Sequence, residues 1–276
     1  MMILVDMNQV MIANMMMQIG NHQNAEIDVS MLRHMILNTL RANRKKFTAE
    51  FGELVICCDD TNYWRRQMYP YYKANRKKTR DKSEMDWNAI FQALNSIRDE
   101  LKTFFPYKVI HMDHLEADDI IGALTINKAC PLIGEDVVII SADKDFIQLQ
   151  KHGHVIQWSP MFNKMIKEEN PRRYLFEHLL KGDSGDGVPN ANSHDDVFVT
   201  AARQTPMTKK AIDKYWDNRD DLESIMKPNV YRNFMRNAQM IDLENTPDGI
   251  REAAINKYEN YDYPARSNIL TYLIEH

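Results

Sequence analysis

The chain is poor in cysteine, and the few it has show no pairing pattern. Its three cysteines are Cys57, Cys58 and Cys130, and they form no Cys-x-x-Cys motif. A disulfide-stapled fold is therefore not expected, and a reducing compartment is the natural setting. We expect these thiols to be core residues.

Strong net charge and long hydrophobic runs are also absent. Lysine and arginine number 35 against 39 acidic residues, a formal charge of −4, so net charge alone neither favours nor excludes a nucleic-acid partner. The apolar start, residues 1–5, meets Asp6 at once and has no basic segment before it, so we expect neither a signal peptide nor a membrane span there. With 44% apolar residues and no repeats, the 276-residue chain is expected to be a globular cytoplasmic protein.

Short β-branched runs alternate with amphipathic stretches over the first part of the chain. We expect strands at 3–5, 54–58, 108–110 and 137–140, and helices over 29–40 and 88–104. This alternation predicts an α/β fold with a parallel sheet covered on both faces. From about Tyr174 the patterns become helical, so we expect an α/β domain over residues 1–170 and a smaller all-helical domain over 171–276.

Acidic residues recur where the apolar segments end. Asp6, Asp59 and Asp143 each follow an expected strand, and the carboxyl ends of parallel strands meet at one edge of a sheet. Clustered carboxylates repel one another unless cations lie between them, and hard divalent cations take oxygen ligands. The pattern predicts a multi-metal site. Further acids that we assign to it are Glu116, Asp118, Asp119, Asp145, Asp183 and Asp186.

Several of these acids have ordinary structural explanations as well. Asp6 can cap the helix after it, and Asp143 and Asp145 fit a helix amino terminus, which attracts acids. Glu116 and Asp119 share a helix face, whereas Asp118 points about 160° away from Glu116, so some ligands must act through water. The segment Gly182–Gly187 does not have the spacing of a calcium loop, and we expect a tight glycine-shaped turn that presents two acids.

Basic residues form two runs, at 41–46 and 65–82. The first has an equally good explanation as a solvated helix face. The second is interleaved with the aromatic residues Tyr63, Trp64, Tyr69, Tyr71 and Tyr72. Basic side chains neutralise phosphates and aromatic rings stack on unpaired bases, so this mixture suits a single strand or a frayed end. Carboxylate-bound metals beside a phosphate-binding segment predict metal-assisted phosphodiester hydrolysis, with two ions about 4 Å apart.

An ordered set of motifs through about Pro189 resembles the flap endonuclease and 5′-nuclease family, and within it the T-even-type phage ribonucleases H. Each motif is weak alone, but their order and spacing are specific. The matching segments are 3–8, 55–60, 63–66, 71–76, 116–120, 141–145 and 182–189.

The resemblance implies a PIN-like parallel-sheet core with a helical arch at about 61–87. It implies one Mg²⁺ at Asp6, Asp59, Asp118 and Asp143, a second at Asp145, Asp183 and Asp186, partly through water, and further site acids at Glu116 and Asp119. Mn²⁺ can substitute. Asp59 is preferred to Asp60 because the family's aspartate follows its strand directly. Lys73 and Arg65 match the basic residues over the scissile phosphate, and the nucleic-acid-binding residues are Arg66, Tyr72, Arg76, Lys77 and Lys78.

After Gly187 the chain departs from the family, since no Gly-x-Gly follows. A helix-turn-helix-type element in 171–276 is still expected to grip duplex DNA. We therefore predict a monomeric Mg²⁺-dependent 5′-3′ exonuclease, flap endonuclease and ribonuclease H that removes lagging-strand primers. Its substrates would be DNA and RNA–DNA hybrids with 5′ ends, nicks or flaps. Expected partners include a single-strand-binding protein or a sliding clamp, in the host cytoplasm if the chain is phage-encoded.

Two other functions remain open at this point. One is a non-catalytic module that binds branched DNA through the same basic arch. The other is a phosphatase with an aspartate nucleophile, because Asp143-Lys144-Asp145 after a strand is compatible with it.

Overall fold

A computed structural model describes residues 1–20, 27–128, 135–265 and 267–275. Contacts divide the chain into two compact units. Unit 1 comprises Met1–Thr61, Glu84–Lys167 and Pro247–His276, and unit 2 comprises Asn62–Ser83 and Glu168–Thr246. Within the described ranges, every helix is too short or too polar to cross a membrane.

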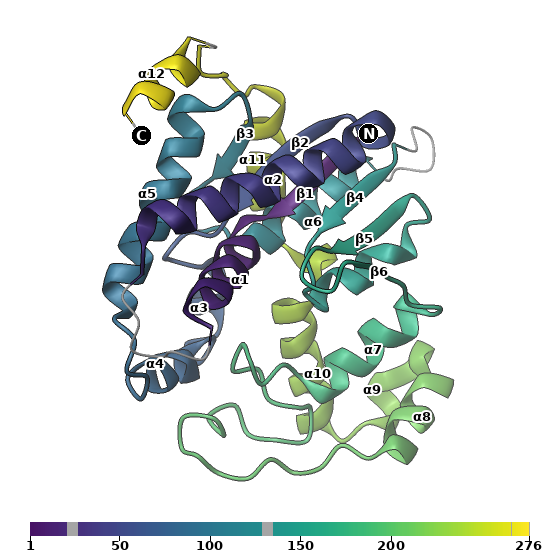
Figure 1. The fold of residues 1–276 in the computed structure, drawn as a ribbon. Coiled ribbons are helices and arrows are strands. Elements are labelled where there is room, and N and C mark those ends of the chain that lie inside the picture. Colours follow the sequence, from purple (N-terminus) through teal and green to yellow (C-terminus); the bar gives the residue numbers. More distant parts are fainter. Residues whose placement is uncertain (21–26, 129–134, 266, 276) are drawn as a thin grey trace. The chain divides into compact units, whose positions relative to one another are not determined.

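Unit 1 is built on a six-stranded sheet, shown in Figure 1. The strands are β1 (Met2–Asp6), β2 (Glu53–Cys58), β3 (Lys108–His111), β4 (Val137–Ile140), β5 (Val155–Ser159) and β6 (Lys164–Ile166). Their order is β3-β2-β1-β4-β5-β6, and only β6 runs antiparallel to its neighbour. The four expected strands are confirmed. Strands β5 and β6 were not expected from the sequence, because Gln157 interrupts the apolar run of β5 and β6 has only three residues.

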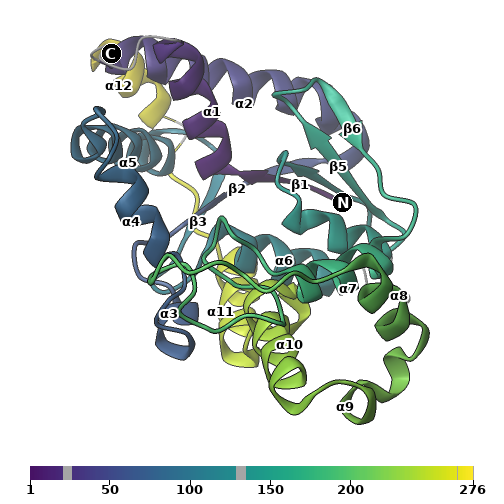
Figure 2. The same cartoon turned by 90° about the horizontal axis from the view of Figure 1, so that it is seen from below.

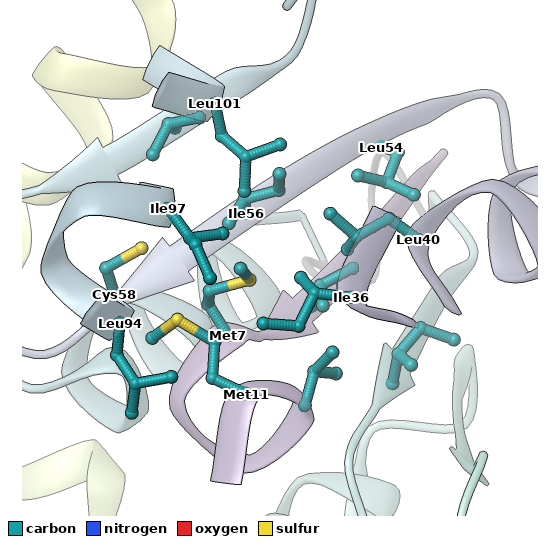
Figure 3. Close-up of a cluster of buried hydrophobic side chains, with 14 of the residues drawn as sticks. Met7, Met11, Ile36, Leu40, Leu54, Ile56, Cys58, Leu94, Ile97 and Leu101 are labelled. Carbon is teal, nitrogen blue, oxygen red and sulfur yellow. The ribbon is translucent and has the colours of Figure 1, made fainter. Parts of the chain in front are cut away.

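Helices cover both faces of this sheet, as the strand–helix alternation predicted. On one face lie α1 (Met7–Ile19), α2 (Val29–Phe51) and α5 (Trp87–Phe104) (Figure 2). Their apolar side chains form one core with alternate residues of β1 and β2, including Ile3, Val5 and Ile56. Figure 3 shows a part of this core around Ile56. On the other face α6 (Ala117–Lys128) packs against β1, β2 and β4, and the 3₁₀ helix η1 (Asp145–Lys151) packs against β5. Cys57 and Cys58 are buried free thiols, as expected; Cys130 lies outside the described residues.

Unit 2 is helical among its described residues. It contains α3 (Trp64–Met68), α4 (Ala74–Arg80), α7 (Pro171–Lys181), α8 (Lys209–Asp217), η2 (Arg219–Asp221), α9 (Leu222–Ile225), α10 (Pro228–Ile241) and η3 (Leu243–Asn245). The ring of Phe176 on α7 packs against Trp216 of α8 and Phe234 of α10. Asn237, buried on α10, donates to the carbonyls of Leu179 and Pro189, so α10 holds both α7 and the loop after it.

The last two helices belong to unit 1, which differs from the expected single helical domain over 171–276. α11 (Asp248–Glu259) packs against α6 and β3, and α12 (Asn268–Glu275) packs against α5. The Tyr272 ring meets Phe104 and Phe105 of the α5 end, with centroids 5.5 and 4.8 Å away. Burial of these aromatic rings offsets the conformational entropy that the end of the chain loses when it packs against α5. The domain limits expected from the sequence, 1–170 and 171–276, stay a prediction.

Candidate metal centre and nucleic-acid interface

Asp6 ends β1 and is buried, with 6% of its surface exposed. Its Oδ1 accepts from the Gln9 amide at 3.1 Å, so it caps α1. Its Oδ2 accepts from the Ser141 hydroxyl at 2.9 Å, at the end of β4. Asp6 therefore caps α1 and also lies at the strand ends, so the two explanations that the sequence offered for it hold together.

Asp59 follows β2 and joins the same edge of the sheet. Its Oδ2 accepts from Asn8 Nδ2 at 2.6 Å, and its Oδ1 accepts from the Ala117 amide at 2.7 Å. The neighbouring Asp60 is held elsewhere, since it accepts from the His114 amide at 2.9 Å and lies 3.7 Å from His111 Nε2. These contacts favour Asp59 over Asp60 as the candidate ligand.

Burial and neighbouring negative charges both affect the pKa of Asp6 at this edge of the sheet. Burial raises the pKa of Asp6 to about 7, and the negative charges of Asp59 and Asp143 add to the rise, against the lowering effect of its two hydrogen bonds. Burial also raises the pKa of the Cys57 thiol, with added contributions from Cys58, Asp6 and Asp118. Asp6 is thus influenced by the acids that follow β2 and β4, and Asp118 of α6 acts with Asp6 on the same thiol.

The three acids at the start of α6 separate as helix geometry predicts. Glu116 and Asp119 are buried, and the Glu116 amide donates to Asp119 Oδ2 at 2.9 Å. Asp118 lies on another side of the helix and is half-buried. Asp118 and Asp6 both act on the Cys57 thiol, whereas Asp119 is engaged with the backbone at the helix start.

The β4 end carries supporting polar residues that were not assigned from the sequence. The Ser141 hydroxyl, which donates to Asp6, also accepts from the Asp143 amide at 3.0 Å. Gln157, fully buried on β5, donates to the carbonyls of Ser141 and Asp143 at 3.0 and 2.6 Å. Asp143 is itself exposed, and its Oδ1 accepts from the Asp145 amide at 3.0 Å. The sequence held one signal for these supporting residues: Gln157 lies within an apolar run, and a buried amide needs hydrogen-bond partners.

The donor set of unit 1 suits a hard divalent cation. Asp6, Asp59, Asp118 and Asp143 supply carboxylate oxygens only, and no cysteine sulfur or imidazole is required. A cation beside Asp6 would stabilise its charged form and so oppose both the burial and the repulsion from Asp59 and Asp143 that raise its pKa. The residues therefore fit the expected metal.

The two acids of the glycine loop belong to unit 2, where both carboxylates have partners. Asp183 Oδ1 accepts from the amides of Gly185 and Asp186 at 2.7 and 3.1 Å, and its Oδ2 lies 3.7 Å from His178 Nε2. Burial alone would raise the pKa of Asp183, but the interactions with His178 and these amides outweigh it and lower the pKa. The loop closes through a bridge between Asp183 and Val188, which confirms the tight turn.

Gly187 gives a test of this turn. Its φ is +72°, and a Cβ there would lie 2.9 Å from the Tyr71 carbonyl oxygen. We expect Gly187→Ala to lower the free energy of unfolding by about 2 kcal/mol, because of the strained backbone and the clash. Thermal unfolding would measure the change. Gly153→Ala, where a Cβ would meet none of the described residues within 4 Å, is the control, and equal losses in both variants would contradict the prediction.

Arg65 and Lys73 are buried in unit 2. Arg65, 2% exposed, donates from Nε to the Met240 carbonyl at 2.9 Å. Lys73, 6% exposed, places Nζ 3.5 Å from Asp186 Oδ2 and 5.1 Å from the ring centroids of both Tyr63 and Tyr72. Both cations are therefore desolvated and fixed, unlike residues of an ordinary exposed helix.

The other basic and aromatic residues of the segment differ in exposure. Arg66, Lys77 and Lys78 are exposed, and Arg76 is exposed while its guanidinium pairs with Asp186. Tyr72 is 2% exposed, and its hydroxyl donates to Asp186 Oδ2 at 2.8 Å. Stacking of Tyr72 on a base would require this segment to open.

Comparisons with known proteins agree with this architecture over the whole chain. Residues 1–175 match the family of the 5′-3′ exonuclease N-terminal resolvase-like domain, and residues 171–276 match the family described as T4 RNase H, C terminal. The chain is 34% identical to ribonuclease H of Enterobacteria phage T4, over 99% of this chain and 90% of that protein. It is 30% identical to the flap endonuclease Xni of Shewanella baltica, over 54% of each chain.

Solved structures of a phage T5 nuclease share the fold. A flap endonuclease complex of that phage with DNA and metal ions aligns with a TM-score of 0.61 at 16% identity, over 99% of this chain and 98% of the other. A T5 5′-exonuclease with bound zinc also gives 0.61, at 15% identity, over 93% and 97%. At these identities the likeness concerns the fold.

Proposed function

Because this chain belongs to the 5′-3′ exonuclease family, with a C-terminal region of the T4 RNase H type, we propose how its two units carry out that nuclease activity. The protein is a nuclease with 5′-3′ exonuclease and flap endonuclease character. We propose Mg²⁺ as its metal, with Mn²⁺ as a substitute. The two alternatives open at the sequence level, a silent DNA-binding module and a phosphatase, are not favoured by relatives that are nucleases.

One observation carries the proposal for the site: Asp6, Asp59 and Asp143 lie at the carboxyl ends of β1, β2 and β4, with the Ser141 hydroxyl joining Asp6 to the Asp143 backbone. We assign Asp6, Asp59, Asp118 and Asp143 as ligands of the first ion, with Asn8 and Ser141 orienting two of them. For the second ion, Asp145, Asp183 and Asp186 stay a prediction from the sequence. When bound, the divalent ions would supply an acidified water and neutralise the charge that develops on the phosphate oxygens.

The basic segment of unit 2 would act on the phosphates. Lys73 and Arg65, fixed by buried contacts, are suited to one scissile phosphate because preorganised cations lose little freedom on binding. Arg66, Arg76, Lys77 and Lys78 would neutralise neighbouring phosphates without reading sequence.

We propose RNA primers, nicked or gapped duplexes and 5′ flaps as substrates, cut to leave 5′-phosphate and 3′-hydroxyl ends. Both RNA and DNA would be cut, since we assign no residue to the 2′-hydroxyl. The protein would act as a monomer during replication in the cytoplasm, the host's if phage-encoded. A single-strand-binding protein or a sliding clamp would be its partner.

Cleavage of a 5′-labelled flapped duplex tests the function. We expect short 5′ products with Mg²⁺ or Mn²⁺ and none with chelator. Asp143→Asn should lower the cleavage rate about 10³-fold, because a lost ligand removes several kcal/mol of charge stabilisation, while duplex binding persists.

Asp113→Asn is the matched control, since Asp113 is an exposed acid of unit 1 that we assign to no ligand role. It should cleave like the wild type. Binding without cleavage under every metal condition would refute the catalytic proposal. Unchanged cleavage by Asp143→Asn would refute its place in the site.

A further inference from the structure

Asp186 is the centre of a charge cluster inside unit 2. Its Oδ2 accepts from the Tyr72 hydroxyl at 2.8 Å and lies 3.5 Å from Lys73 Nζ. Its Oδ1 pairs with the Arg76 guanidinium. Both carboxylate oxygens are thus engaged by residues 72–76, and Asp186 is itself buried. Two cations and one hydroxyl meet a single carboxylate.

The backbones interlock at the same place. The Lys73 amide donates to the Asp186 carbonyl at 2.7 Å, although Lys73 has a left-handed backbone with φ of 55°. Asn75 Nδ2 donates to the Ser184 carbonyl at 2.7 Å, and Arg76 Nε donates to the Gly185 carbonyl at 3.1 Å. Residues 72–76 therefore contact residues 184–187 through both main chain and side chains.

This geometry differs from what a metal ligand requires. A ligand carboxylate directs an oxygen lone pair at the ion, whereas here Lys73 and Arg76 already balance the charge of Asp186. A cation would have to displace one of these contacts and would be repelled by Lys73 and Arg76. Asp183, in the same loop, has amide and imidazole partners instead.

We infer that Asp186, which the sequence motif assigns to the second ion, acts instead as a positioning residue: it anchors the basic segment 62–83 to the glycine loop and fixes the Lys73 ammonium, and it is not a direct ligand of that ion. The ammonium has three donor protons, so it can keep Asp186 and still donate to a phosphate. Without the anchor, the buried Lys73 ammonium and the exposed Arg76 guanidinium both lose their counter-charge, and the segment opens. The anchoring of the segment can be tested without substrate, whereas the use of Lys73 on a phosphate rests on the proposed function.

Tryptic cleavage of the metal-free full chain measures this opening, because Lys77 and Lys78 are exposed cleavage points within the segment. We expect Asp186→Asn to speed cleavage at residues 76–82 by about tenfold or more, since proteolysis follows the population of the open form. Tyr72→Phe, which removes a single donor and keeps the ring, should give a smaller increase in the same peptides. Asp220→Asn, an exposed acid of unit 2 outside the segment, is the matched loss of one charge and should cleave like the wild type.

Calorimetric titration of the same variants with Mn²⁺ separates the two roles. The anchor role requires that Asp186→Asn keep the wild-type affinity for both ions within about threefold. A tenfold loss of affinity for one ion, with cleavage of the segment unchanged, would overturn it. Wild-type cleavage rates in both Asp186→Asn and Tyr72→Phe would also overturn it, and the nuclease assignment would stand regardless because no substrate is used.

Discussion

Replacing Asp6 with asparagine should stabilise the metal-free protein at pH 8 by about 2–4 kcal/mol and abolish its stabilisation by Mg²⁺. The folded pKa of Asp6 is about 7, above the value of 3.8 for a free side chain, so the folded state holds the proton more tightly. The wild type therefore loses stability as pH rises from about 4 through 7, and the loss is complete above 7. Asparagine carries no charge and escapes this loss. Its side-chain oxygen can still cap α1, and the Ser141 hydroxyl can accept instead of donate.

Chemical denaturation at pH 5 and pH 8, with and without Mg²⁺, measures both effects. The variant should gain little over the wild type at pH 5 and most at pH 8. Asp28→Asn is the matched control, because Asp28 caps α2 in the same way, through the Met31 amide, but is exposed and away from the cluster. A variant less stable than the wild type at pH 8 would show that the lost hydrogen bonds of Asp6 outweigh the relief of carboxylate repulsion and burial.

Replacing Lys73 with alanine should slow cleavage about 10²–10³-fold, while the dissociation constant for nicked duplex rises only a few-fold. The ammonium is desolvated between Tyr63 and Tyr72, so its charge acts at short range on a phosphate placed beside it. An exposed lysine acts instead through long-range attraction that salt screens.

Single-turnover cleavage and equilibrium binding, measured for the same variants, separate these effects. Lys77→Ala, on the exposed side of α4, is the matched control and should weaken binding with little change in the cleavage step. Comparable losses in rate and binding for Lys73→Ala would reduce Lys73 to a general electrostatic role.

Local patterns in the sequence were enough for most of the unit 1 architecture. The runs around Ile3, Ile56 and Ile139 are β-branched and continuous, as strands buried on both faces must be, and their helices show regular apolar spacing. The acids at the strand ends follow from the same pattern, because parallel strands bring their carboxyl ends to one edge. Strand β5 was missed because Gln157 breaks its apolar run and meets hydrogen-bond partners, the Ser141 and Asp143 carbonyls, that only the folded chain brings to it. Strand β6 was missed because it has only three residues.

The sequence by itself therefore determined the α/β class, the four central strands and the gathering of Asp6, Asp59 and Asp143, since each depends on local periodicity and the geometry of parallel sheets. Only the tertiary structure decided that Asp6 has a raised pKa, that Tyr72 and Lys73 are buried, and that Asp186 pairs with Lys73 and Arg76. It also decided that Tyr272 returns to α5 in unit 1. Burial and charge pairing join residues more than 100 positions apart, and no spacing along the chain encodes which partner a desolvated charge will meet.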